Sequence, residues 1–233
     1  MTKRLVLLPG LDGTGQLFGA FLTALPDTFA ATTVSYPADK VLSYSELRPF
    51  VNAAVPKVEP FVLLAESFST PLALEFAASN PPNLTAVVIC AGFVFKPIAH
   101  WPQLAKAVAQ PWLFRLRVPR AILEYFLVGR NAPRSVIQEL RQVLRFVSPQ
   151  VLSGRVCEAL NCDARNALAR TTVPLMYVQA MQDKLLGDSC VGEMKRIKPD
   201  IFIVQVAGPH LLLQREPQKV ASAVTTFVQE LRS

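Results

Sequence analysis

Short apolar runs recur along the chain, and most of them are bounded by Pro, Gly or Asn. Each run is rich in Val, Ile, Leu or Phe, a composition typical of strands that are buried on both faces of a sheet. The runs cover residues 4–8, 32–36, 61–65, 86–90, 175–179 and 201–206. We therefore expect about six buried strands.

Stretches with helical spacing of apolar residues lie between several of these runs. They cover residues 16–25, 44–55, 70–79 and 218–231. Strands that alternate with helices predict an α/β fold, a mostly parallel sheet of about six strands with helices on both faces. Right-handed crossovers then bring the carboxyl ends of the strands, and any site built on them, to one edge.

The alternation stops after Val94, where amphipathic helical segments punctuated by Pro follow one another up to residue 170. We expect helices over residues 103–109, 112–116, 121–128, 134–146 and 148–160. The pattern predicts a helical lid (residues 94–170) inserted into a core formed by residues 1–93 and 171–233. Aromatic side chains of the lid are candidates to line a substrate cavity, or else they hold the lid on the core: Trp101, Trp112 and Phe126.

Composition excludes several classes of protein. Of the 233 residues, 51% are apolar, which suits a large core, and no apolar run is long enough to span a membrane. The apolar run near the N-terminus is too short for a signal peptide. Four scattered cysteines without a CxxC motif indicate reduced thiols and a cytoplasmic protein. With only two histidines, neither near a cysteine pair, we expect no metal and no cofactor.

The positive charge is concentrated in one segment. Between Lys96 and Arg170 there are ten Arg and two Lys against four acidic residues, so this segment carries the whole excess of the net +7. Arginines suit phosphate or carboxylate partners, which include an anionic acyl carrier. The alternative is an ordinary solvated helical face. No nucleic-acid partner is expected.

Ser67 stands where an apolar run passes directly into a helical pattern. Small residues, Ala65 and Ser69, lie two positions before and after it. This arrangement is typical of a nucleophile elbow, a tight strand-to-helix turn that holds a serine hydroxyl at the sheet edge. The alternative is that Ser67 only caps the helix. We expect the neighbouring Glu66 to be a solvated or helix-terminal carboxylate.

Two further candidates follow later strands. Asp183 comes after the run 175–179 and His210 after the run 201–206, so the chain order is Ser, Asp, His. We predict that His210 is the general base, that Asp183 orients it, and that Ser67 is the nucleophile. The other histidine, His100, lies in the predicted lid with no strand before it.

A tetrahedral oxyanion would need backbone donors, and two are predicted. One is the N–H of Phe68, directly after the serine, and the other is the N–H of Leu11 in the glycine-rich loop after the first strand. Gly10 and the other glycines of this loop allow a substrate to approach the backbone closely. The loop matches neither the dinucleotide-binding nor the P-loop pattern.

Four motifs together resemble the α/β-hydrolase superfamily. They are the Leu-Pro-Gly-Leu-Asp-Gly-Thr-Gly loop, the Ala-Glu-Ser-Phe-Ser elbow, the Gln-Asp-Lys-Leu-Leu loop and the Gly-Pro-His turn. The resemblance spans residues 4–231 and implies that the sheet starts at the family's third strand. The opening loop is also similar to that of phytyl ester synthase-type acyltransferases. Pro9 stands where many members have His, and the elbow lacks the usual glycines.

These observations favour a serine hydrolase, specifically a carboxylesterase that acts on a small-molecule ester with an apolar acyl group. The runner-up is a thioesterase or acyltransferase that uses coenzyme A or acyl-carrier substrates. A third possibility is a ligand-binding protein of the same fold that does not turn its ligand over.

Overall fold

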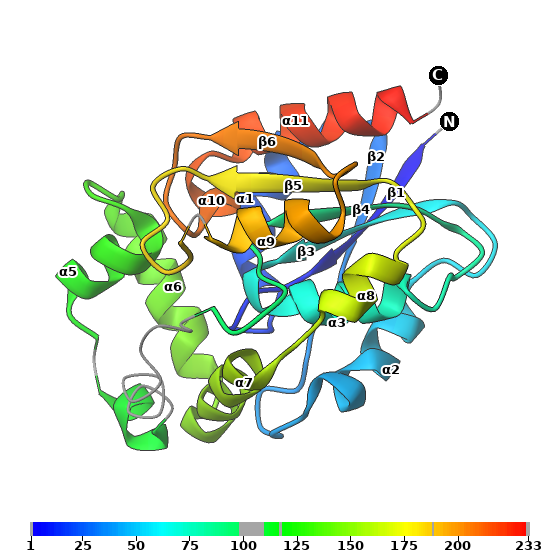
Figure 1. The fold of residues 1–233 in the computed structure, drawn as a ribbon. Coiled ribbons are helices and arrows are strands. Elements are labelled where there is room, and N and C mark those ends of the chain that lie inside the picture. The colour runs from blue at the N-terminus through cyan, green and yellow to red at the C-terminus, as the bar shows by residue number, and fades with distance from the viewer. Residues whose placement is uncertain (1, 98–109, 117, 188, 232–233) are drawn as a thin grey trace.

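The computed structural model describes residues 2–97, 110–116, 118–187 and 189–231. Its centre is one sheet of six strands in the order β2-β1-β3-β4-β5-β6, in which all neighbours pair parallel (Figure 1). The strands are β1 (Lys3–Leu8), β2 (Phe29–Thr33), β3 (Phe61–Glu66), β4 (Leu84–Cys90), β5 (Leu175–Ala180) and β6 (Phe202–Val206). The predicted α/β class with a parallel six-stranded sheet is confirmed.

Helices cover both faces of the sheet, because alternate strand residues point to opposite sides. One face packs against α2 (Tyr44–Ala54), α3 (Thr70–Ala77), α8 (Arg165–Arg170) and α9 (Ser189–Ile197). The other face packs against α1 (Gly19–Ala24), α10 (Leu212–Arg215) and α11 (Pro217–Glu230). In β3, Leu63 joins the first cluster and Leu64 the second, and both are fully buried. Two apolar layers thus hold the strand ends in fixed positions.

The predicted strand over residues 32–36 was placed too late in the chain. Strand β2 runs over Phe29–Thr33, and its register with β1 starts at Lys3 opposite Phe29. Val34 and Tyr36 are buried beyond its end, where the Tyr36 N–H donates to the Gly13 carbonyl at 2.7 Å. The Val34 N–H still donates to the Leu7 carbonyl of β1 at 2.9 Å, and the burial of Val34 and Tyr36 in one core cluster explains the strand-like alternation.

Helical segments follow β4 at the carboxyl edge of the sheet (Figure 1). They are η3 (Pro111–Arg115), α5 (Arg120–Leu123), η4 (Glu124–Val128), α6 (Arg134–Phe146) and α7 (Pro149–Asn161). Segments α5, η4 and α6 share an apolar cluster, which includes Leu17 and Leu211 from the rest of the chain, and α7 contributes Val151 and Leu152 to a second, smaller cluster. The expected helix over residues 103–109 lies outside the described residues. The division into core and lid stays a prediction.

The remaining expectations from composition concern membranes and thiols. Among the described residues, no helix has both the length and the apolar character needed to cross a membrane. All four cysteines are free: Cys90 and Cys162 are buried, Cys190 is half-buried and Cys157 is exposed.

Candidate active site

Ser67 occupies a strained turn between β3 and α3. Its φ is 46°, in the left-handed region that costs a residue with a side chain about 1 kcal/mol or more. The short helix η2 (Ser67–Ser69) starts at this residue. Ala65 and Ser69 are both fully buried, so larger side chains would not fit there. Strand, turn and helix thus form an elbow that holds the Ser67 hydroxyl at the carboxyl edge of the sheet.

The structure brings the Ser67, His210 and Asp183 side chains together. Ser67 Oγ lies 2.8 Å from His210 Nε2, and His210 Nδ1 lies 2.7 Å from Asp183 Oδ2. Asp183 follows β5 and His210 follows β6, so both loops start at the same sheet edge as the elbow. These contacts orient the imidazole so that Nε2 can accept the serine proton while Nδ1 donates to the carboxylate.

The Asp183 carboxylate is held in place from its other side. Its Oδ1 atom accepts hydrogen bonds from the backbone N–H groups of Leu185 at 2.7 Å and Leu186 at 2.9 Å. The side chain of His210 is 3% exposed, so the pair is shielded from water. Both partners of the serine therefore have fixed orientations.

The loop after β1 folds into a tight turn beside the elbow. The Gly13 N–H donates to the Gly10 carbonyl at 3.0 Å, and Asp12 Oδ2 accepts from the Thr14 N–H at 2.8 Å. Leu11 lies inside this turn, and within the described part of the chain its N–H makes no hydrogen bond. An unpaired, partly buried N–H is what an oxyanion donor requires before substrate binds.

Side-chain hydroxyl groups tie the elbow to its surroundings, a feature that sequence reasoning missed. Ser69 Oγ donates to the Pro9 carbonyl and lies 2.8 Å from the Tyr36 hydroxyl. The Tyr44 hydroxyl donates to the Phe68 carbonyl at 2.8 Å, and the two rings stack. Ser69 therefore does more than fit a tight space: its hydroxyl joins the loop after β1 to the elbow, which a glycine could not do.

Of the two expectations for Glu66, the helix-terminal one is confirmed, because Glu66 is the N-cap of η2, and the solvated one is wrong. Its side chain is 1% exposed, and Oε1 has no hydrogen-bond partner within the described residues. Burial raises the pKa of Glu66 to about 7, and the charge of Asp12 acts in the same direction, whereas Gln214, His210 and the Gly10 N–H oppose it. Glu66 is the last residue of β3, and both faces of a central strand are covered. Its position at the end of a central strand could have predicted that Glu66 is buried.

This burial predicts how stability depends on pH. The folded pKa of Glu66 is about 7 and its ordinary value is 4.5. The folded state thus holds the proton more tightly, and ionisation removes stability as pH rises between these values. Relative to wild type, Glu66→Gln should gain about 3 kcal/mol of unfolding free energy between pH 4.5 and pH 8. Urea unfolding at both pH values measures this, and parallel changes in the two proteins would contradict it.

The residues predicted to contact the substrate lie in different parts of the structure. Gly10 lies against the Glu66 carboxyl group, Trp112 is 58% exposed on η3, and Phe126 is 39% exposed on η4. Trp101 and the alternative base His100 lie outside the described residues. Next to Phe126, the Leu127 carbonyl accepts from the Leu211 N–H at 2.9 Å. Segment η4 is thereby attached to the loop that carries the histidine.

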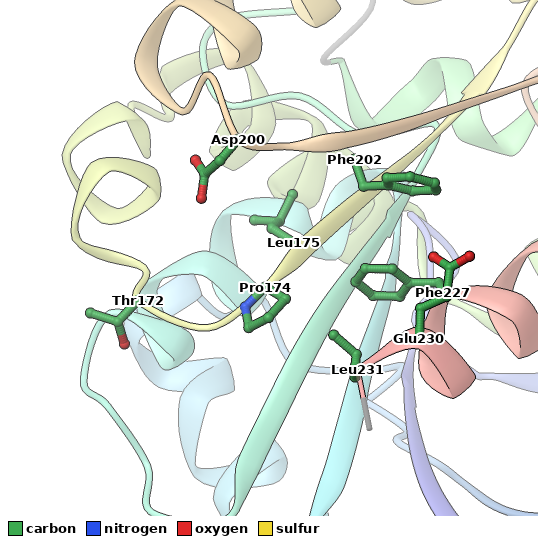
Figure 2. A pocket seen from close by; sticks show the side chains of 8 residues that line it. All are labelled: Thr172, Pro174, Leu175, Asp200, Phe202, Phe227, Glu230 and Leu231. Atoms are coloured by element: carbon green, nitrogen blue, oxygen red, sulfur yellow. The ribbon is translucent and has the colours of Figure 1, made fainter. Parts of the chain in front are cut away.

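Of two surface hollows, the larger lies away from these residues. The larger, of about 360 Å³, is formed by the start of β5, the start of β6 and the end of α11, at the amino ends of the strands (Figure 2). It is therefore at the opposite edge of the sheet from Ser67. The other includes Phe95, Arg165 and Glu193. Across the residues that the structure describes, no group of His, Cys, Asp and Glu side chains is suited to a metal ion.

Comparisons with known proteins agree with this architecture. No protein-family model matches the sequence. An esterase from Exiguobacterium antarcticum aligns with a TM-score of 0.82 at 14% identity, over 97% of this chain and 92% of that chain. A bromoperoxidase from Bacillus anthracis aligns with a TM-score of 0.81 at 13% identity, over 98% of this chain and 92% of that chain. A hydrolase from Pseudomonas aeruginosa aligns with a TM-score of 0.74 at 20% identity, over 97% of this chain and 90% of that chain. The chain has the fold of the α/β-hydrolase superfamily.

Proposed function

We propose that the chain is a serine hydrolase that cleaves carboxylic esters with an apolar acyl group. The observation that carries the proposal is the chain of hydrogen bonds from Ser67 through His210 to Asp183, set at a strained strand-to-helix turn. The esterases and hydrolases among the solved structures of this fold are consistent with it. The free thiols favour a reducing, cytoplasmic setting.

The reaction would proceed through an acyl-enzyme. Ser67 Oγ attacks the ester carbonyl carbon while His210 Nε2 accepts the hydroxyl proton. The N–H groups of Leu11 and Phe68 stabilise the tetrahedral oxyanion. His210 then donates the proton to the departing alcohol, and a water molecule activated by the same imidazole releases the acid. Asp183 stabilises the imidazolium in both halves of the cycle.

Exposed apolar side chains support an apolar acyl group. The helical segments between β4 and α8, which we propose act as a lid, carry large hydrophobic residues at the surface: Trp112, Leu116, Ile122, Tyr125 and Phe126. Segment η4 holds two of them next to the histidine loop. An aliphatic or aromatic chain leaving water for such a surface gains free energy with each methylene group that it buries.

Transfer to or from a phosphate-bearing acyl carrier has less support. Several arginines of the basic segment pair with carboxylates of the same chain. Arg120 pairs with Glu124 at 2.8 Å, and Arg165 pairs with Asp163 at 2.5 Å. Exposed pairs of this kind account for part of the positive charge without a ligand.

A series of p-nitrophenyl esters tests the proposed function. We expect hydrolysis of the acetate and a rise in kcat/KM of up to about fourfold per added methylene, as long as each added group is buried against the apolar surface. Acyl-coenzyme A thioesters of the same chain lengths serve as the comparison. Absence of hydrolysis of every ester by the folded protein would refute the function, and a strong preference for the thioesters would favour the carrier alternative.

A further inference from the structure

Arg155 is a buried cation whose contacts lead to the proposed oxyanion loop. It lies on α7, and its side chain is 2% exposed. Nη1 donates to the Leu11 carbonyl at 3.0 Å and to the Asp12 carbonyl at 2.5 Å, and Nη2 donates to the Pro37 carbonyl at 3.0 Å. One guanidinium group therefore joins α7, the loop after β1 and the loop after β2.

The surroundings of Arg155 indicate a role other than charge pairing. Within the described residues, no carboxylate lies within ion-pair distance of its guanidinium group. The neighbouring Asp12 uses Oδ2 to accept from the Thr14 N–H and hydroxyl groups. The Tyr36 ring lies 5.7 Å away. A buried cation is costly unless it is satisfied, and here backbone carbonyls provide that satisfaction. The position of the guanidinium group is therefore fixed by carbonyl groups of the two loops that it binds.

Gly13 provides the matching space on the loop side. Its φ of 67° favours glycine, and a Cβ atom at this position would lie 2.3 Å from Arg155 Nη1. The same residue closes the turn by donating to the Gly10 carbonyl. Leu11 is thus held from two directions, by the turn that contains it and by the guanidinium group that binds its carbonyl.

We propose that Arg155 is a positioning residue for the oxyanion hole, through which the docking of α7 fixes the Leu11 N–H in its productive orientation. The proposal deepens the proposed hydrolase function and rests on it. It implies that the helical segment after β4 acts on the chemical step as well as on substrate access. Loss of the guanidinium group should weaken binding of the tetrahedral state more than binding of the ground state.

The test compares Arg155→Met with wild type on a small neutral ester. Because removal of one oxyanion donor costs about 10²–10³ in kcat, a misplaced donor should lower kcat by about 10²-fold, with KM changed less than about threefold. Affinity for a trifluoromethyl ketone, which forms a tetrahedral adduct with a serine, should fall by a similar factor, whereas affinity for the product carboxylate should not. Arg155→Lys, which keeps the charge and some donors, should lie between.

Arg141→Met is the matched control. Arg141 is partly buried on α6 and donates to the Val118 carbonyl at 3.1 Å, and within the described residues it makes no hydrogen bond to the oxyanion loop. This variant should lose stability without a change in kcat. Should Arg155→Met fail to fold, Arg155→Lys carries the test, because it keeps the cation and removes the planar set of donors. It should lower kcat by less than 10²-fold with little change in KM, and a folded Arg155→Lys variant with wild-type kcat would refute the role of Arg155.

The outcomes separate the two proposals. An inactive wild-type protein would refute the hydrolase function. An active wild type with a folded Arg155→Met variant of equal kcat and equal trifluoromethyl ketone affinity would refute only the role of Arg155. Equal losses in tetrahedral and ground-state binding would also overturn it, because they would indicate general distortion of the site.

Discussion

Replacing Ser67 with alanine is expected to lower kcat for ester hydrolysis by about 10⁴-fold or more, because Ser67 carries the hydroxyl that contacts His210, whereas the Ser69 hydroxyl is bonded to the Pro9 carbonyl. Since the serine adopts a φ of 46° that alanine also disfavours, the variant should fold with nearly unchanged stability. Steady-state hydrolysis of a p-nitrophenyl ester, with circular dichroism on the same samples, measures both properties.

Ser35→Ala is a suitable control, because Ser35 is exposed just beyond β2 and remote from the elbow in sequence. It should keep wild-type turnover. A folded Ser67→Ala variant that retained more than a few per cent of activity would contradict the role of Ser67, and the nucleophile would have to be sought elsewhere.

The second large effect concerns the base and its partner. His210→Ala and Asp183→Asn should each lower kcat by about 10⁴-fold, the first by removing the proton acceptor and the second by favouring the wrong imidazole tautomer. Because the three groups act as a unit, adding Ser67→Ala to His210→Ala should cause little further loss. Single-turnover kinetics of acylation measures the effect directly.

His100→Ala tests the alternative base that the sequence contains. It should leave turnover close to wild type, although His100 lies outside the described residues. Loss of activity in His100→Ala together with retention in His210→Ala would reverse the assignment of the base. For the base assigned here, additive losses in the Ser67→Ala, His210→Ala double variant would indicate that Ser67 and His210 do not act together.

Periodicity and chain order were sufficient to predict the sheet and the meeting of three side chains. Buried parallel strands have nearly continuous apolar runs, so five of the six predicted strands lie within two residues of the observed ones. The parallel topology places the loops after β5 and β6 at the edge that also holds the elbow. Asp183 and His210 therefore had to approach Ser67, and they lie in hydrogen-bond contact.

The supporting contacts could not be predicted, because they depend on burial and on distant pairs. Glu66 reads as a polar end of a strand, yet α-helical layers on both sides bury it. In the sequence, Arg155 is one of many basic residues of its segment, and the carbonyl groups that it binds belong to residues 144 and 143 positions earlier in the chain, Leu11 and Asp12. A local signal existed: Arg155 falls at helical spacing from Val151 and Ala159, on the buried face of α7. Which carbonyl groups it binds follows only from tertiary structure.

The most direct test of the central claim is to react the wild-type protein with a fluorophosphonate and locate the adduct by peptide mass spectrometry. One adduct is expected, on Ser67, formed in step with the loss of esterase activity and absent after His210→Ala over the same time. An adduct on any other residue, or full inactivation without modification of Ser67, would contradict it.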